Sequence, residues 1–314
     1  MSPAWQVVSS APCEVGESPF WHPHEQMLYW VDIPARTIHR ANVFMGSVES
    51  WAMTAPHALE PGCIAPAAGG GLAIALRDGI YRARAWQGPL ELVVRFSHDA
   101  ATTRFNDGKA DPLGRFWAGT IYEPRSARNA GLFSIDCRPG NGQGGKPLVS
   151  TQAQDAIVAN GLAWSPDAAS VYWADTPGHV VHAWDWDAAS NSMQNRRVLH
   201  QFQGKPAGWS PGQPGYGGGP DGAAVDSQGN YWCAMFEGGQ LCKLSPAGEM
   251  LEHITLPVRC PTMPCFGGDD LQTLFVTSAS HNRPADELAA LPLSGHVLWT
   301  RVDVPGLPVN FFRD

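Results

Sequence analysis

Short apolar stretches recur along the chain at intervals of roughly 43 to 59 residues. Each contains aromatic or branched side chains, and the six stretches begin at Tyr29, Leu72, Phe116, Tyr172, Tyr231 and Leu274. A further run precedes each stretch, a second follows it after a turn signal, and an alternating run comes third in five of the repeats. Alternating runs bounded by Gly, Pro, Asn and Asp are typical of half-buried strands. Repeats of this length predict an all-β fold, a six-bladed β-propeller with four antiparallel strands per blade.

The last repeat lacks an outer strand. After its second run the chain passes through Pro305-Gly306-Leu307-Pro308 and reaches Asp314 without another alternating segment. A strand-like run at residues 5–9 precedes the first repeat and has no partner of its own. We expect this run to pair with the last blade and close the ring, because closure removes an exposed sheet edge. A frayed N-terminus is the alternative. No linker divides the chain, so residues 1–314 are expected to form a single domain.

The predicted inner strands carry polar residues in a common register. These strands cover residues 16–21, 61–67, 104–110, 159–165, 219–226 and 260–268. The side chains that stand about ten to twelve positions before the apolar stretch are Glu17, Asn106, Asn160 and Asp221, with Gly62 or Cys63 and Thr262 in the other two blades. In a propeller such side chains point into the central tunnel, where an unpaired carboxylate is costly.

Two carboxylates and two amide oxygens form a ligand set made of oxygen alone. Such a set suits hard cations such as Ca²⁺, Mg²⁺ or Mn²⁺. His and Cys are absent from these positions, which disfavours a zinc cage of nitrogen and sulfur. The alternative is that these residues form turns, because Asn106-Asp107-Gly108, Asn160-Gly161 and Asp221-Gly222 have turn-favouring compositions. Their shared register across separate blades favours the site.

Several motifs resemble those of the SMP-30/gluconolactonase/regucalcin family over nearly the whole chain. They are Gly16-Glu17-Ser18-Pro19-Phe20-Trp21, Arg104-Phe105-Asn106-Asp107-Gly108-Lys109, Asn160-Gly161-Leu162-Ala163-Trp164, Pro220-Asp221-Gly222-Ala223 and Phe266-Gly267-Gly268. The resemblance implies a six-bladed propeller that hydrolyses sugar lactones with one divalent metal ion in its tunnel. It implies metal ligands at Glu17, Asn160 and Asp221, and substrate contacts at Arg104 and Asn106. Some members add an acidic residue after the Ala-Gly-Thr segment, for which Glu123, followed here by Pro124, is the candidate.

The resemblance therefore predicts a lactonase that converts an aldonolactone, such as glucono-1,5-lactone, to the free aldonic acid. The expected cofactor is one divalent ion, which could be Ca²⁺, Zn²⁺, Mn²⁺, Mg²⁺ or Fe²⁺. Asp221 is the predicted general base, because a carboxylate beside the metal can accept a proton from water. Arg104 could orient sugar hydroxyls or a developing oxyanion, or it could be a surface arginine in a salt bridge. A Ser-His-Asp hydrolase is disfavoured, since the sequence has no Gly-x-Ser-x-Gly motif.

A propeller without catalytic activity, which binds calcium or a protein partner, is the alternative function. Propellers host many functions, so the fold alone does not decide between the two. The charged and amide residues gathered in one predicted tunnel favour the enzyme.

Composition narrows the partners and the compartment. The net charge is −8 and no Lys/Arg cluster occurs, so nucleic acid is not an expected partner. No apolar run approaches the ~20 residues that a membrane span needs, and the N-terminus shows no secretory signal. Seven Cys without a C-x-x-C pair favour free thiols and a cytoplasmic location. We expect a small-molecule sugar lactone as partner, and a monomer or a weak homo-oligomer.

A long segment at residues 204–219, rich in Gly and Pro, precedes the inner strand that carries Asp221. Long irregular loops at such places are often functional. We expect this loop to overhang the tunnel and to offer Trp209 or Tyr216 as an apolar wall for a sugar ring. A solvated insertion without ligand contact is the alternative.

Overall fold

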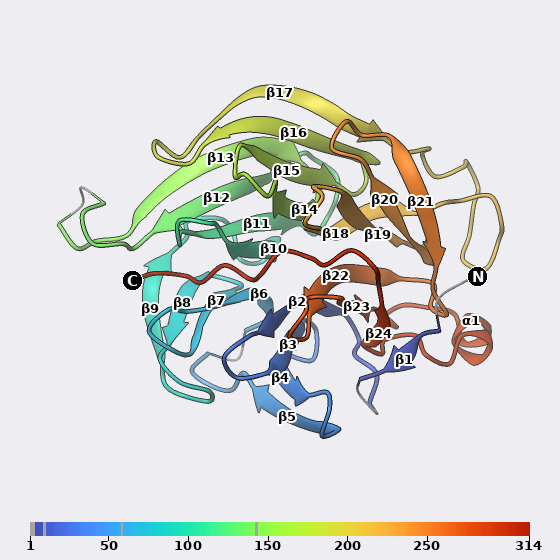
Figure 1. The fold of residues 1–314 in the computed structure, drawn as a ribbon, viewed down its shortest axis with the longest axis horizontal. Coiled ribbons are helices and arrows are strands. Elements are labelled where there is room, and N and C mark those ends of the chain that lie inside the picture. Colours follow the sequence, from blue (N-terminus) through green and yellow to red (C-terminus); the bar gives the residue numbers. More distant parts are fainter. Residues whose placement is uncertain (1–3, 9–10, 58, 142–143) are drawn as a thin grey trace.

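The computed structural model describes residues 4–8, 11–57, 59–141 and 144–314. In these residues, 24 β-strands form six four-stranded antiparallel sheets that surround a central axis as blades (Figure 1). The predicted all-β, six-bladed propeller is confirmed. One short helix, α1 (Ala285–Ala290), lies between the last two strands of the chain and was not expected from the strand-like repeat.

The strands of each blade run outward from the axis in sequence order, with the N-terminal strand as the one exception. The inner strands are β2 (Gly16–His22), β6 (Pro61–Pro66), β10 (Thr103–Ala110), β14 (Ala159–Trp164), β18 (Gly219–Val225) and β22 (Pro261–Gly267). The second strands are β3 (Met27–Asp32), β7 (Leu72–Leu76), β11 (Phe116–Tyr122), β15 (Ser170–Asp175), β19 (Tyr231–Phe236) and β23 (Thr273–Ser278). The third strands are β4 (Thr37–Asn42), β8 (Gly79–Ala83), β12 (Ala130–Asp136), β16 (Val180–Asp187), β20 (Gln240–Leu244) and β24 (Leu298–Arg301). The outer strands are β5 (Ser47–Ala52), β9 (Leu90–Arg95), β13 (Leu148–Ala156), β17 (Ser192–Gln201), β21 (Met250–Thr255) and β1 (Gln6–Val7).

The sixth blade takes its outer strand from the N-terminus, as predicted. In β1, Gln6 pairs with Trp299 and Val7 pairs with Leu298 of β24. Of the predicted run at residues 5–9, Ser9 lies outside the described residues. Because the first and last segments of the chain share one sheet, the ring is held closed by backbone hydrogen bonds.

Every inner strand has an irregular pairing with its second strand at the same height. The shifts fall between Glu17 and Phe20, Pro61 and Cys63, Phe105 and Gly108, Asn160 and Ala163, Pro220 and Ala223, and Pro261 and Met263. A β-bulge leaves residues unpaired and turns their side chains away from the regular alternation. Asn106, Asn160 and Asp221 therefore lie inside strands, at bulges, and the alternative interpretation of these residues as turns at strand ends was wrong.

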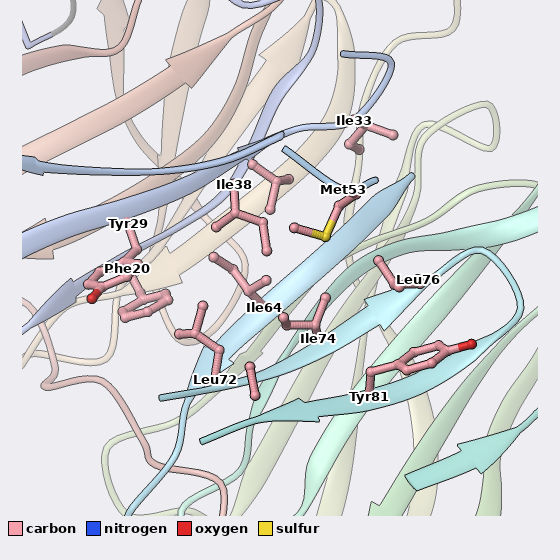
Figure 2. Close-up of a cluster of buried hydrophobic side chains, with 12 residues drawn as sticks. Phe20, Tyr29, Ile33, Ile38, Met53, Ile64, Leu72, Ile74, Leu76 and Tyr81 are labelled. Atoms are coloured by element: carbon pink, nitrogen blue, oxygen red, sulfur yellow. The ribbon is translucent and has the colours of Figure 1, made fainter. Parts of the chain in front are cut away.

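Apolar side chains fill the spaces between neighbouring blades. Figure 2 shows one such cluster, in which Ile38 of the first blade faces Ile64 and Ile74 of the second. All five residues of β7 are buried, because this strand is covered by a blade on each side. Burial of apolar surface contributes roughly 25 cal/mol per Å². The clusters between blades therefore hold each inner strand, and the polar residues on it, in a fixed position.

The C-terminal segment returns across the ring after β24 (Figure 1). It forms isolated bridges between Gly306 and Asp226 and between Phe312 and Ala67. Phe312 is fully buried among side chains of the second and third blades, including Phe116. The segment thus ties together blades that are distant in sequence, at the end of the tunnel where the inner strands finish.

Candidate active site

The four polar residues predicted for the tunnel lie near the starts of four inner strands. Glu17 is 5 % exposed, Asn160 is 2 % exposed, Asp221 is 6 % exposed and Asn106 is 7 % exposed. Each stands at the bulge of its strand, one per blade in four of the six blades. In the sixth blade the equivalent Thr262 is also buried, but its hydroxyl donates to the Gly16 carbonyl at 2.5 Å, and its oxygen lies 2.8 Å from Thr277 Oγ1.

A chain of hydrogen bonds fixes the two amides. Asn106 Nδ2 donates to Asn160 Oδ1 at 2.8 Å and to the Ala159 carbonyl at 3.0 Å. Asn160 Nδ2 donates to Thr176 Oγ1 at 2.7 Å, and the Thr176 hydroxyl donates to the Pro220 carbonyl at 2.7 Å. Both donor hydrogens of Asn106 are therefore used within the protein, and the amide oxygen of Asn160 has a defined orientation with one lone pair still available.

The two carboxylates share an unfavourable environment. Burial, with the nearby charge of Asp107 as the next cause, raises the pKa of Glu17 to about 8. Burial, followed by the charges of Glu17 and Asp107, raises the pKa of Asp221 well above its usual range. Among the described residues neither carboxylate forms an ion pair, and Glu17 accepts a hydrogen bond only from the Ser18 backbone N–H, at 2.9 Å. Two buried acids of like charge that lack a basic partner form a site suited to a cation.

The donor set fits a divalent ion that prefers oxygen. The described residues contain no group of three or more His, Cys, Asp or Glu side chains arranged to hold a metal. An ion bound here would therefore depend on the two carboxylates of Glu17 and Asp221 together with the amide oxygen of Asn160. Such a mixture of carboxylate and carbonyl-type oxygens, with water completing the shell, matches the preference of Ca²⁺, Mg²⁺ and Mn²⁺.

Arg104 and Glu123 lie beside this group and contact one another. Arg104 Nε lies 3.3 Å from Glu123 Oε1, and Arg104 Nη1 donates to Asn106 Oδ1 at 2.9 Å. Glu123 also accepts from both terminal nitrogens of Arg77, at 2.9 and 3.1 Å. Arg104 thus forms a salt bridge, but it is not the surface arginine of the alternative interpretation, because its side chain is only 15 % exposed and lies next to the amide network. Its link to Asn106 connects Glu123 to the tunnel residues.

Asp107 and Lys109 belong to the same region and were not singled out from the sequence. Asp107 Oδ2 accepts from the Leu162 backbone N–H at 2.9 Å, and burial raises the pKa of its carboxyl. The Lys109 ammonium donates to the Ala223 carbonyl, and burial lowers its pKa while Asp107 opposes that shift. Regular alternation would direct Asn106 and Asp107 to opposite faces, so no pattern in the sequence indicated that both influence the carboxylates.

A cavity of about 250 Å³ lies farther along the inner strands. Its walls come from later strand positions and from the C-terminal segment, and include Phe20, Trp21, Trp164, Phe266, Leu307 and Val309. Glu17, Asn106, Asn160 and Asp221 do not line it. The partly buried Lys109 also lines this largely apolar cavity, which therefore adjoins the polar group of residues without including its acids or amides.

The loop at residues 204–219 is held by contacts to neighbouring strands and turns, including one from Gln240 Nε2 to the Gly217 carbonyl at 3.1 Å. The Tyr216 hydroxyl lies 2.7 Å from His179 Nε2, and Lys205 Nζ lies 2.5 Å from Glu237 Oε2. The rings of Trp209 and Tyr216 pack against each other with centroids 5.0 Å apart, and Lys205 lies over both. Both aromatic residues are half-buried, so part of the apolar surface expected to face a sugar is used inside the loop.

The fold and the site together define a β-propeller with six blades that has two buried acids and two buried amides at one end of its central tunnel. The chain belongs to the SMP-30/Gluconolactonase/LRE-like family, whose model matches residues 15–280. It is 42 % identical over 312 residues to 6-deoxy-6-sulfogluconolactonase of Pseudomonas putida, covering 99 % of both chains. It is 32 % identical to regucalcin of Danio rerio, covering 94 % of this chain and 93 % of that one.

A solved structure has the same fold. Regucalcin of Agrobacterium tumefaciens, described as a calcium-binding protein, matches with a TM-score of 0.87 and 24 % identity over 99 % of this chain and 98 % of that one. The predicted family membership is confirmed, and the predicted lactonase class agrees with the name of the Pseudomonas relative. Among the described residues, no helix is long and apolar enough to cross a membrane.

Proposed function

We propose that this protein hydrolyses a sugar-acid lactone to the free acid with the help of one divalent metal ion. The observation that carries the proposal is the pair of buried carboxylates, Glu17 and Asp221, whose pKa values are raised by burial and by like charge. Ionising two buried acids without a nearby cation costs free energy, and such a pair is typical of a functional site rather than of a scaffold.

Glu17, Asn160 and Asp221 would hold the ion. When bound, a divalent ion supplies a positive charge that polarises a carbonyl oxygen and lowers the pKa of water. Asn106 holds the amide of Asn160 in the orientation that presents its oxygen, through the hydrogen bond at 2.8 Å. Thr176 holds the other end of the same amide at 2.7 Å.

Asp221 acts as general base in this proposal. It takes a proton from the attacking water, whose oxygen bonds to the lactone carbonyl carbon. The ester bond between that carbon and the ring oxygen then breaks, and Asp221 returns its proton to the ring oxygen, which leaves as a hydroxyl. The acid so formed releases one proton to solvent near neutral pH, which gives the reaction a simple readout.

Arg104, Asn106 and Glu123 position the substrate. The guanidinium of Arg104 is oriented by Glu123 at 3.3 Å and by Asn106 at 2.9 Å, which leaves a rigid cation beside the tunnel. Such a group can donate to sugar hydroxyls or to a developing negative oxygen. Glu123 can accept from a sugar hydroxyl with the lone pairs that its two arginine partners do not use.

The name of the Pseudomonas relative suggests a particular substrate. That protein is a 6-deoxy-6-sulfogluconolactonase and shares 42 % identity over nearly the full length of both chains. A gluconolactone that carries a sulfonate is therefore a candidate substrate beside D-glucono-1,5-lactone itself.

Proton release from D-glucono-1,5-lactone, measured with a pH indicator, tests the proposal. Hydrolysis above the spontaneous rate is expected after addition of Ca²⁺, Mn²⁺, Mg²⁺, Zn²⁺ or Fe²⁺, and loss of activity is expected with a chelator. The sulfonated lactone is assayed in parallel. Tight calcium binding in calorimetry without turnover of any lactone would instead favour the calcium-binding propeller.

A further inference from the structure

Near the proposed site, the side chain of one arginine has no hydrogen-bond or ion-pair partner among the residues that the structure describes. Arg125 follows β11 in the turn toward β12, and its own backbone N–H donates to the Tyr122 carbonyl at 2.9 Å. Its backbone adopts φ 54°, a left-handed conformation that is uncommon outside glycine. Within the described residues, no hydrogen bond or ion pair involves the Arg125 side chain, which is exposed.

The turn lies at the end of the tunnel that carries Asn160. The Tyr122 N–H donates to the Ile157 carbonyl at 3.1 Å, and Ile121 bridges with Val158, two residues before Asn160. The Glu123 N–H donates to the Thr102 carbonyl at 2.9 Å, which anchors the turn beside Arg104. The start of the turn that carries Arg125 is therefore held against the residues that directly precede β14 and β10, the strands that position the two amides.

The charge of Arg125 acts on the tunnel without direct contact. It lowers the pKa of Asp221, against the larger opposing effects of burial, Glu17 and Asp107. No ion pair joins Arg125 to Asp221 among the described residues. The guanidinium thus lies near enough to Asp221 to lower the pKa of that carboxyl without touching it.

Other cations in this part of the molecule pair with carboxylates, apart from the partly buried Lys109, whose ammonium donates to the Ala223 carbonyl. Arg104 pairs with Glu123 at 3.3 Å, and Arg128, on the same turn as Arg125, pairs with Asp155 at 2.9 Å and Asp175 at 3.0 Å. In the neighbouring blades Lys205 pairs with Glu237 at 2.5 Å, and Arg283 pairs with Glu237 at 2.9 Å. Arg125 differs from these four residues, since its charge is available to an external anion.

We propose that Arg125 determines specificity by binding an acidic substituent of the lactone, a sulfonate or a phosphate, at a position remote from the carbonyl. This inference rests on the proposed lactone hydrolysis. A guanidinium donates two parallel hydrogen bonds to such oxyanions. The protein has a net charge of −8 and two acids in the tunnel, so an anionic substrate needs a local positive group to approach.

The contact lies outside the reacting bonds. Binding of a remote substituent stabilises the bound substrate and the transition state alike, so its loss raises KM and leaves kcat nearly unchanged. Arg125 is therefore a specificity residue in this proposal, and Asp221 keeps the chemical role.

The test compares two lactones on three forms of the protein. Kinetics are measured on D-glucono-1,5-lactone and on its 6-deoxy-6-sulfo analogue, for wild type, Arg125→Gln and Arg84→Gln. Arg84 offers a matched control, because it is exposed, loses the same charge, and pairs with Glu91 and Asp314 far from the turn. A 6-phospho analogue in a parallel arm distinguishes sulfonate from phosphate as the preferred substituent.

We expect Arg125→Gln to lower the preference for the charged lactone, as the ratio of the two kcat/KM values, by about 10- to 100-fold, which is the range for a hydrogen-bonded charge. The loss should fall on KM, Arg125→Lys should restore part of the ratio, and Arg84→Gln should retain the wild-type ratio. An unchanged ratio in Arg125→Gln, with wild type still hydrolysing lactones, would overturn the specificity role alone. If wild type hydrolyses neither lactone, the proposed function fails, and calorimetry with the 6-sulfogluconate anion decides whether Arg125 binds it.

Discussion

The two ends of the central tunnel are built from the same six inner strands but from different side chains. At the starts of β2, β14 and β18 stand Glu17, Asn160 and Asp221, which are buried polar groups and include two acids of like charge. At the other end the same strands contribute Phe20, Trp164 and Val225 to an apolar cavity that the C-terminal segment helps to close. The polar end holds buried acids that are unfavourable without a bound cation. The other end holds buried apolar side chains that stabilise the ring.

This division explains how the fold tolerates a polar tunnel. Buried acids without a cation reduce stability, and such groups persist only where the surrounding structure holds them in place. The apolar clusters between blades and the buried C-terminal Phe312 supply that support. The two ends should therefore respond to mutation in different ways, with activity and metal affinity at one end and stability at the other.

The largest effect is expected for Asp221→Asn. Loss of the general base should reduce turnover by a factor on the order of 10²–10⁴. Metal affinity should fall less than turnover, because the amide keeps one oxygen ligand but cannot accept a proton. Proton-release kinetics and calorimetry measure the two quantities, with the exposed Asp303→Asn as control. Retention of more than a tenth of wild-type turnover would remove Asp221 from the catalytic role.

Phe312→Ala tests the opposite end. The ring of Phe312 is 0 % exposed, so its removal should lower the free energy of unfolding by about 3–5 kcal/mol. KM and metal affinity should stay at wild-type values below the melting temperature. Denaturant unfolding gives the stability, and Phe44→Ala, in which the replaced ring is 74 % exposed, is the control. A tenfold change in metal affinity would mean that the two ends are coupled.

Glu17→Gln should separate metal binding from stability at the polar end. Metal affinity should fall on the order of 100-fold, since one charge beside a cation is worth a few kcal/mol at an effective dielectric constant near 20. The metal-free protein should become more stable near neutral pH, because the substitution removes a buried carboxyl group whose pKa is about 8 in the folded protein. Thr262→Val changes the equivalent position of blade six and should leave metal affinity unaltered. Equal affinity in Glu17→Gln and wild type would show that the metal site is misplaced.

Stability of the metal-free protein should depend on pH. The pKa of Glu17 is about 8 in the folded state and near 4.5 when solvated, so the unfolded chain loses this proton first as pH rises. Folding should therefore weaken progressively between about pH 4.5 and pH 8. Bound metal should reduce this loss, because it favours the ionised form. Melting temperatures across this range, with metal or chelator, measure the effect. The same slope in Glu17→Gln would assign it to other groups.

The smallest effect is expected from the loop. Replacing residues 208–216 by a short Gly-Ser linker should raise KM for the best lactone several-fold and preserve metal affinity. The replacement removes Trp209 and the contact between Tyr216 and His179. Unchanged KM across a panel of lactones would leave recognition to Arg104, Asn106, Glu123 and Arg125.

The sequence predicted the architecture well because the repeat is local. In each blade, consecutive segments of the chain form neighbouring strands, so the periodicity of the sequence indicates the strand order and the number of blades. The observed inner strands differ from the predicted ones by one or two residues at most. Helix α1 was missed, because its six residues lie in a single insertion that has no counterpart in other repeats.

What the sequence by itself determined was the ring and the register that aligns Glu17, Asn106, Asn160 and Asp221, since both follow from spacing along the chain. Tertiary structure decided which further groups join them. Bulges in the inner strands bring Asp107 into range of the acids, and a turn fastened to β14 brings in the charge of Arg125. The physical reason is that burial and charge interactions depend on distances between blades, and spacing along one strand does not encode these distances.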